Sequence, residues 1–180
     1  MTAGLVTLLG RLIRLTGNIC KMACYPFHAL FAGKRFFIPA YSPAKIRRGK
    51  TSSVPGMIWQ TNYSNCCSLP MYLNYLFNRL MSLDYDYRYV STEEREEYLR
   101  TNAPPEVYEA YLRLTDGAAQ ADLWRVTVLY LEGGIYMDID ATLVLPLRII
   151  LKGIDNALFV RIKHNTELTN YFLATVPGNP

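Results

Sequence analysis

The stretch Gly133-Gly134-Ile135-Tyr136-Met137-Asp138-Ile139-Asp140 decides how the rest of the chain is interpreted. A Gly-Gly break precedes a short apolar run, which predicts a strand over 135–138 that leads into two acidic residues. In an extended segment, side chains two positions apart point the same way, about 6 to 7 Å apart. Asp138 and Asp140 are therefore a candidate site for Mn²⁺ or Mg²⁺, which prefer carboxylate, phosphate and water oxygens. The alternative is an exposed acidic pair at a strand end.

A helix predicted over 118–132, directly before this strand, carries two charged residues on one face. Asp122 and Arg125 stand three positions apart among apolar neighbours, and charges in such surroundings need partners. They can pair with each other, which is worth roughly a few tenths of a kcal/mol. A ligand is the other possibility, with Arg125 directed toward a diphosphate and Asp122 toward sugar hydroxyls.

The remaining chain alternates between predicted strands and predicted helices. Ser91 and Glu94 have the spacing of a capping box, and Pro104-Pro105 ends one helix and starts another. A second acidic pair, Asp84 and Asp86, falls in a polar, aromatic segment that we expect to be a solvated turn. The pattern favours an α/β fold with helices on both faces of a largely parallel sheet and a site at the strand carboxyl ends. The expected strands span 57–59, 87–90, 135–138 and 158–160, and the expected helices 71–81, 92–100, 105–114 and 118–132.

Charge is distributed unevenly along the 180 residues. All ten Lys and Arg residues from Arg11 to Arg79 precede the first acid, Asp84, whereas the rest has nine Lys and Arg against fifteen Asp and Glu. A basic front joined to an acidic body predicts that one end meets an anionic surface. Nucleic acid is not favoured, because no basic helix, zinc spacing or aromatic ribonucleoprotein motif accompanies the charge. The four cysteines lack zinc-site spacing and are expected to be reduced, packed thiols.

The basic front, residues 1–50, is predicted to begin with an amphipathic helix over 4–21. Its cations, Arg11, Arg14 and Lys21, share a narrow polar arc, and leucines fill most of the remainder. Such a helix is typical of segments that lie in the headgroup plane of an anionic membrane. Its three cations interrupt the apolar run that a membrane-spanning helix needs. We therefore expect a peripheral protein, on the cytoplasmic face, in which residues 1–50 form the leader and 51–180 the main domain. Packing of this helix on the chain's own core is the alternative.

Three ordered blocks resemble the DXD-containing sugar-transferase family, which includes yeast-type α-1,6-mannosyltransferases, capsule and lipopolysaccharide glycosyltransferases, and the glucosylating domains of large clostridial toxins. The blocks are Pro55 to Thr61, Ala121 to Arg125, and Gly133 to Asp140. The resemblance implies a GT-A-like fold, a nucleoside-diphosphate sugar donor, a divalent metal, and transfer that retains the anomeric configuration. It extends over roughly 54–180.

By position, the resemblance implies that Trp59 stacks on the nucleotide base, with core packing as the alternative. It also implies that Asp122, Arg125 and Tyr136 contact the donor and that Asp138 and Asp140 hold the metal. No residue is assigned as a catalytic nucleophile or base. Ala121 replaces the usual serine, and 165–180 resembles the start of the family's next helix and a Pro-Gly turn.

The expected function is transfer of a sugar to a polysaccharide or lipid-linked acceptor, as in capsule or lipopolysaccharide biosynthesis. Because the family's further carboxy-terminal segment does not follow, a truncated and catalytically inactive remnant that binds nucleotide sugar is the first alternative. A membrane-bound scaffold that uses only residues 1–50 is the second.

Overall fold

The computed structural model describes residues 3–161 and 167–180, and these form a sheet with helices on both faces. Within the described residues, six strands join in the order β2-β5-β3-β6-β8-β7, and β1 pairs with β4 in a separate ribbon. The strands are β1 (Phe36–Phe37), β2 (Tyr41–Ser42), β3 (Met57–Thr61), β4 (Cys66–Cys67), β5 (Asp86–Val90), β6 (Gly134–Met137), β7 (Ala157–Arg161) and β8 (Leu168–Thr175). The helices are α1 (Ala3–Leu30), α2 (Leu69–Leu80), α3 (Thr92–Asn102), α4 (Pro105–Arg113), α5 (Gly117–Glu132) and α6 (Leu147–Ile150).

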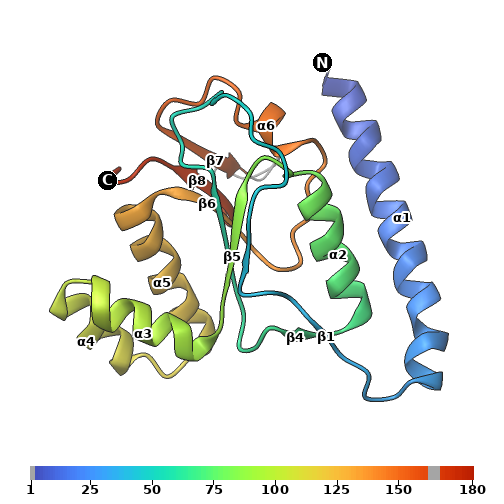
Figure 1. The fold of residues 1–180 in the computed structure, drawn as a ribbon, viewed down its shortest axis with the longest axis horizontal. Helices are drawn as coiled ribbons and strands as arrows, with labels where there is room; N and C mark the ends of the chain where they lie inside the picture. The colour runs from blue at the N-terminus through green and yellow to red at the C-terminus, as the bar shows by residue number, and fades with distance from the viewer. Residues whose placement is uncertain (1–2, 162–166) are drawn as a thin grey trace.

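The helices form two layers, with α1 and α2 on one side of the sheet and α3, α4 and α5 on the other (Figure 1). Alternate residues of the central strands supply the two cores. Ile58 and Ile135 face the α2 side, whereas Trp59 and Tyr136 face the α5 side. The predicted α/β fold with helices on both faces is therefore confirmed.

Local signals place most of the helix ends where the sequence predicts them. Ser91 Oγ accepts a hydrogen bond from the Glu94 amide at 3.3 Å, and Glu94 Oε2 accepts one from the Ser91 amide at 2.7 Å. The predicted capping box therefore opens α3. Asp116 caps α5 through the Ala118 amide, and Gly133 ends that helix with φ of 67°. These caps satisfy backbone groups that a helix end would otherwise leave unpaired.

The sheet is mixed, which corrects the expectation of a largely parallel one. Within the described residues, β3 pairs in parallel with β5 on one side and with β6 on the other, while all the pairings of β2, β7 and β8 are antiparallel. The helix expected within 165–180 is also wrong. From Leu168 to Thr175 the chain forms β8, which fills the space beside β6, and residues 165 and 166 lie outside the described part.

Residue 50 is not a structural boundary between a leader and a domain. Strand β2 pairs with β5, and Ile38 is completely buried in the main core. The segment after α1 is therefore part of the globular body. The cysteines are free thiols, as predicted, and Cys24 and Cys67 are buried, but Cys20 is exposed rather than packed.

The segment Asp84-Tyr85-Asp86 is packed rather than a solvated turn. Asp84 pairs with Arg148 at 3.1 Å, and its side chain is 13% exposed. Asp86 Oδ1 accepts a hydrogen bond from the Ala44 amide at 2.8 Å, and the Tyr85 ring is buried in the core. These long-range partners lie far away in sequence, so the local pattern did not reveal them.

Burial of Tyr85 predicts a loss of stability at alkaline pH. Burial raises the pKa of the Tyr85 hydroxyl to about 12, whereas an exposed tyrosine titrates near about 10. Between these values the unfolded chain releases a proton that the folded chain keeps, so the free energy of unfolding falls as pH rises. Urea unfolding across this range should show that fall, with a shallower slope in Tyr85→Phe. An unchanged slope in the variant would contradict the assignment.

Helix α1 lies along one edge of the molecule beside α2 (Figure 1). Its contacts with the body run along one side, where Val6, Leu9, Ile13 and Phe27 are half-buried and Cys24 is buried. The alternative of packing on the core is therefore correct for this side of the helix only. No helix among the described residues is long and apolar enough to cross a membrane.

Candidate functional site

The acidic pair lies at the carboxyl edge of the three parallel strands, directly after β6. The Asp138 amide donates to the Tyr171 carbonyl of β8, and the Asp138 carbonyl accepts from the Ala141 amide at 3.0 Å. A turn therefore starts at Asp138, and Asp140 lies within it rather than in an extended strand. This corrects the expectation of period-two geometry. Both residues still project at the same edge, with Asp138 half-buried and Asp140 exposed.

Two buried side chains contact the carboxylate of Asp138 and hold it in place. Tyr136 donates its hydroxyl to Asp138 Oδ1 at 2.8 Å, and Arg125 Nη1 lies 3.5 Å from the same oxygen. Burial raises the pKa of the Tyr136 hydroxyl well above its usual range, so this group stays a proton donor. Among the described residues, no group donates a hydrogen bond to the other oxygen, Asp138 Oδ2, so Oδ2 is available to a ligand.

Arg125 joins all the elements of this site. Its guanidinium lies 4.5 Å above the centre of the Tyr136 ring, forms an ion pair with Asp122, and donates to the Asn170 carbonyl of β8. Arg125 is 4% exposed, whereas the Asp122 side chain is 54% exposed. The structure thus brings together Asp122, Arg125, Tyr136 and Asp138. Asp122 pairs with Arg125, and its side chain is also exposed to solvent. It can therefore keep this ion pair and contact a ligand at the same time.

Polar side chains from β3 and α2 fix the backbone around the acidic pair. Gln60 donates to the Asp138 carbonyl at 3.0 Å and accepts from Tyr87 at 2.8 Å. Asn74 donates to the Ile139 and Ala141 carbonyls, and Asn78 donates to the Ala141 carbonyl as well. The sequence reasoning missed these residues. Two asparagines four positions apart, on a helix over 71–81 that is mostly apolar and aromatic, were the signal that could have revealed them.

Comparison with known protein families agrees with this geometry. Residues 70–158 match the profile of a family described as the glycosyltransferase sugar-binding region containing DXD motif. Through these residues, the chain is similar to the DXD sugar-transferase family. No curated protein sequence matches the chain. The family supports a glycosyltransferase-like function, and the mixed sheet flanked by helices is the GT-A-like arrangement expected for it.

The DXD pair fits a divalent cation that shares its ligands with a phosphate. Asp138 Oδ2 and the exposed Asp140 carboxylate supply hard oxygen donors, and in the described chain no group of three or more His, Cys, Asp or Glu residues supplies a full protein cage. Mg²⁺ and Mn²⁺ sites of this kind use one or two carboxylates and leave the other positions to phosphate and water. The donor set therefore suits a metal held jointly with a diphosphate.

Trp59 is placed differently from what the resemblance to the DXD family implies. It is 5% exposed, its Nε1 donates to the Gly133 carbonyl at 3.0 Å, and its ring meets Trp124 edge-on. Gly133 lies at the amino end of β6, opposite to the acidic pair. A ring that stacks on a base needs an open face, so the core-packing alternative is correct for Trp59.

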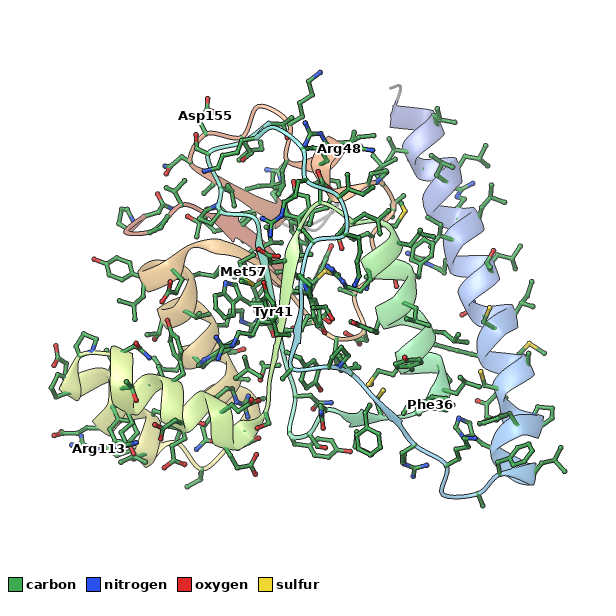
Figure 2. The ribbon with its side chains drawn as sticks, viewed as in Figure 1. Phe36, Tyr41, Arg48, Met57, Arg113 and Asp155 are labelled. Atoms are coloured by element: carbon green, nitrogen blue, oxygen red, sulfur yellow. The ribbon has the colours of Figure 1, made fainter. Side chains whose placement is uncertain are left out.

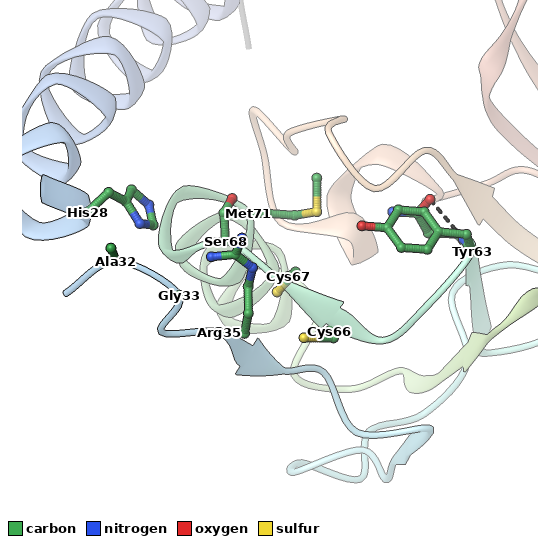
Figure 3. A pocket seen from close by; sticks show the side chains of 10 residues that line it. His28, Ala32, Gly33, Arg35, Tyr63, Cys66, Cys67, Ser68 and Met71 are labelled. Atoms are coloured by element: carbon green, nitrogen blue, oxygen red, sulfur yellow. Dashed lines mark hydrogen bonds between the residues drawn. The ribbon is translucent and has the colours of Figure 1, made fainter.

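A cavity of about 570 Å³ opens at the carboxyl end of β3, and Figure 3 shows the side chains that line it. Two of the lining residues lie close in sequence to residues that fix the DXD turn. Asn62 comes two residues after Gln60, and Met71 lies one helical turn before Asn74. Tyr63, which is 72% exposed, also lines the cavity. Its position in a polar loop directly after a strand was the available signal. The lining also includes His28, Arg35, Cys66, Cys67 and Ser68.

Proposed function

We propose that this chain transfers a sugar from a nucleoside-diphosphate donor to a glycan or lipid-linked acceptor, in a metal-dependent reaction that retains the anomeric configuration. One observation carries the proposal. Arg125 and Tyr136 both contact Asp138 Oδ1 at the carboxyl ends of the parallel strands, and Asp138 Oδ2 is left available to a ligand. Each of these groups is buried or half-buried and already oriented. Such a site needs little rearrangement when charge develops on a leaving diphosphate.

Each residue has a distinct proposed task. Asp138 and Asp140 would hold Mn²⁺ or Mg²⁺, which when bound neutralises charge on the diphosphate. Arg125 adds a fixed positive charge next to Asp138, and Tyr136 holds the Asp138 carboxylate in place by its hydrogen bond. Asp122 offers its exposed carboxylate to donor hydroxyls. Tyr63 has the open aromatic face that Trp59 lacks and is our candidate for stacking on a base or sugar ring.

Metal-dependent donor binding tests this proposal. We expect UDP- or GDP-sugars to stabilise the protein against heat in the presence of Mn²⁺ and much less in its absence. A ligand at about 100 times its dissociation constant adds about 2.7 kcal/mol to the free energy of unfolding. Asp140→Asn should lose the Mn²⁺-dependent part of this gain while leaving the fold unchanged, because Asp140 is exposed and no other described side chain pairs with it.

Asp155→Asn is the matched control, because it removes the charge of another exposed aspartate. Asp155 lies at the opposite end of the molecule from Phe36 (Figure 2). Equal donor affinity in wild type and Asp140→Asn would refute the metal site. Donor hydrolysis or sugar transfer by the purified chain separates an active transferase from a protein that only binds nucleotide sugars.

A further inference from the structure

Helix α1 has an apolar face that the rest of the described chain leaves uncovered. Leu5, Leu8, Leu12, Leu15, Ile19 and Met22 follow one another at spacings of three and four, and Leu30 continues the same line. Their exposed fractions run from 45% at Leu5 to 78% at Leu30. We call this set the free face of α1. It points away from the side on which Val6, Leu9 and Ile13 meet the body.

A cationic arc borders this free face. At about 100° per residue, Arg11, Arg14 and Lys21 lie between the free face and the side that packs on the body. All three are exposed. Lys34 and Arg35 follow at the carboxyl end of the helix, and Phe31 and Phe37 add exposed aromatic rings there. No acidic residue occurs before Asp84.

We infer that α1 binds the surface of an anionic lipid bilayer through its free face. Exposed leucines in one line supply apolar area for the boundary between headgroups and acyl chains, and the bordering Lys and Arg side chains reach anionic headgroups. Each such cation near an anionic surface strengthens binding. The helix lies in the plane of the membrane and does not cross it, which agrees with its charge and mean hydropathy. This inference is independent of whether the chain transfers sugar.

Charge distinguishes the bilayer from a second copy of this chain. The three-four spacing of the free face would also suit a helical pair. However, a second α1 would bring the same arginines and lysine to the contact and no acid to neutralise them. An anionic bilayer satisfies both the apolar line and the cations.

Membrane binding would place the proposed site at the lipid surface. The carboxyl end of α1 lies at the same end of the molecule as β1 and β4 (Figure 1), and His28 of α1 lines the cavity at the carboxyl end of β3. Arg35 lines the same cavity. A lipid-linked acceptor in the same bilayer would therefore have a short path to this edge of the sheet.

Sedimentation of the full chain with phosphatidylcholine vesicles, with and without phosphatidylglycerol, tests the inference. We expect binding to the anionic vesicles that weakens as salt is raised, and little binding to the neutral ones. The triple variant Leu12→Gln, Leu15→Gln, Ile19→Gln should bind about 100-fold more weakly, because it removes apolar area from the lipid contact. The variant Arg11→Gln, Arg14→Gln, Lys21→Gln should lose a comparable factor on anionic vesicles only.

A matched triple variant controls for general loss of exposed apolar surface. Leu112→Gln, Val126→Gln, Ile149→Gln changes side chains that are 54% to 55% exposed, close to the 51% to 58% of the first triple, but on other elements. It should bind vesicles as wild type does, and circular dichroism should show all variants folded. The inference is overturned if wild type ignores anionic vesicles, if both apolar triples bind equally, or if wild type is a dimer in solution that the α1 triple dissociates.

Discussion

Gly134→Ala is expected to destabilise the fold strongly, because the added methyl group meets both backbone strain and close neighbours. Gly134 has φ of 105°, a conformation that side chains with a Cβ rarely adopt. A Cβ there would lie 2.6 Å from the Met57 carbonyl oxygen and 3.0 Å from Trp59 Nε1. Both groups belong to β3, the strand between β5 and β6, so neither can move aside without disturbing the sheet. Strain and overpacking together should cost about 3 to 5 kcal/mol.

Urea unfolding measures this loss, which is large against a typical domain stability of about 5 to 15 kcal/mol. Gly117→Ala is the matched control, because Gly117 starts α5, has no neighbouring atom within 4 Å of the added carbon, and has an ordinary φ. It should leave stability unchanged or raise it by up to about 1 kcal/mol. A Gly134→Ala protein that unfolds at the wild-type urea concentration would show that β3 and β6 do not approach as described.

Elements with their own start and stop signals were predictable from the sequence. Ser91 and Glu94 fix the start of α3, and Gly133 fixes the end of α5, through contacts within a few residues. Strands β1, β2 and β4 have two residues each and exist only because distant partners complete them. The helix that the resemblance implied within 165–180 is wrong for a related reason, because residues 168–175 pair with both β6 and β7 as strand β8. Tertiary contacts decide such segments.

The candidate site was predictable to the extent that its residues are neighbours in sequence. Asp122 and Arg125 share a helix, and Tyr136 and Asp138 share a strand and the residue after it. The Asn170 carbonyl, which accepts from Arg125, is a backbone group and leaves no trace in the sequence. The base-stacking role of Trp59 rested on its position in the resemblance alone, whereas helices cover both faces of β3 and its ring lies in the core on the α5 side. Its hydrogen bond to Gly133 joins residues 74 positions apart.

Asp138→Asn is expected to reduce sugar transfer about 1,000-fold, the scale on which a preoriented electrostatic group acts. The substitution preserves the shape of the side chain and an oxygen that Tyr136 can still donate to. It removes the negative charge that would bind the metal and that faces Arg125 at 3.5 Å. Arg125 keeps its ion pair with Asp122 and its bond to the Asn170 carbonyl, so the protein should still fold.

Tyr136→Phe separates the charge of Asp138 from its orientation. It leaves the carboxylate intact and removes only the 2.8 Å hydrogen bond that holds it, so transfer should fall only about tenfold. Measuring kcat/KM at rising Mn²⁺ concentrations distinguishes the two variants. Added Mn²⁺ should partly restore Tyr136→Phe, whose carboxylate is present but less well oriented, and should not restore Asp138→Asn. If Asp138→Asn retained transfer within tenfold of wild type, the metal and diphosphate would have to bind elsewhere. The contacts of Tyr136 and Arg125 with Asp138 would then serve only the stability of the fold.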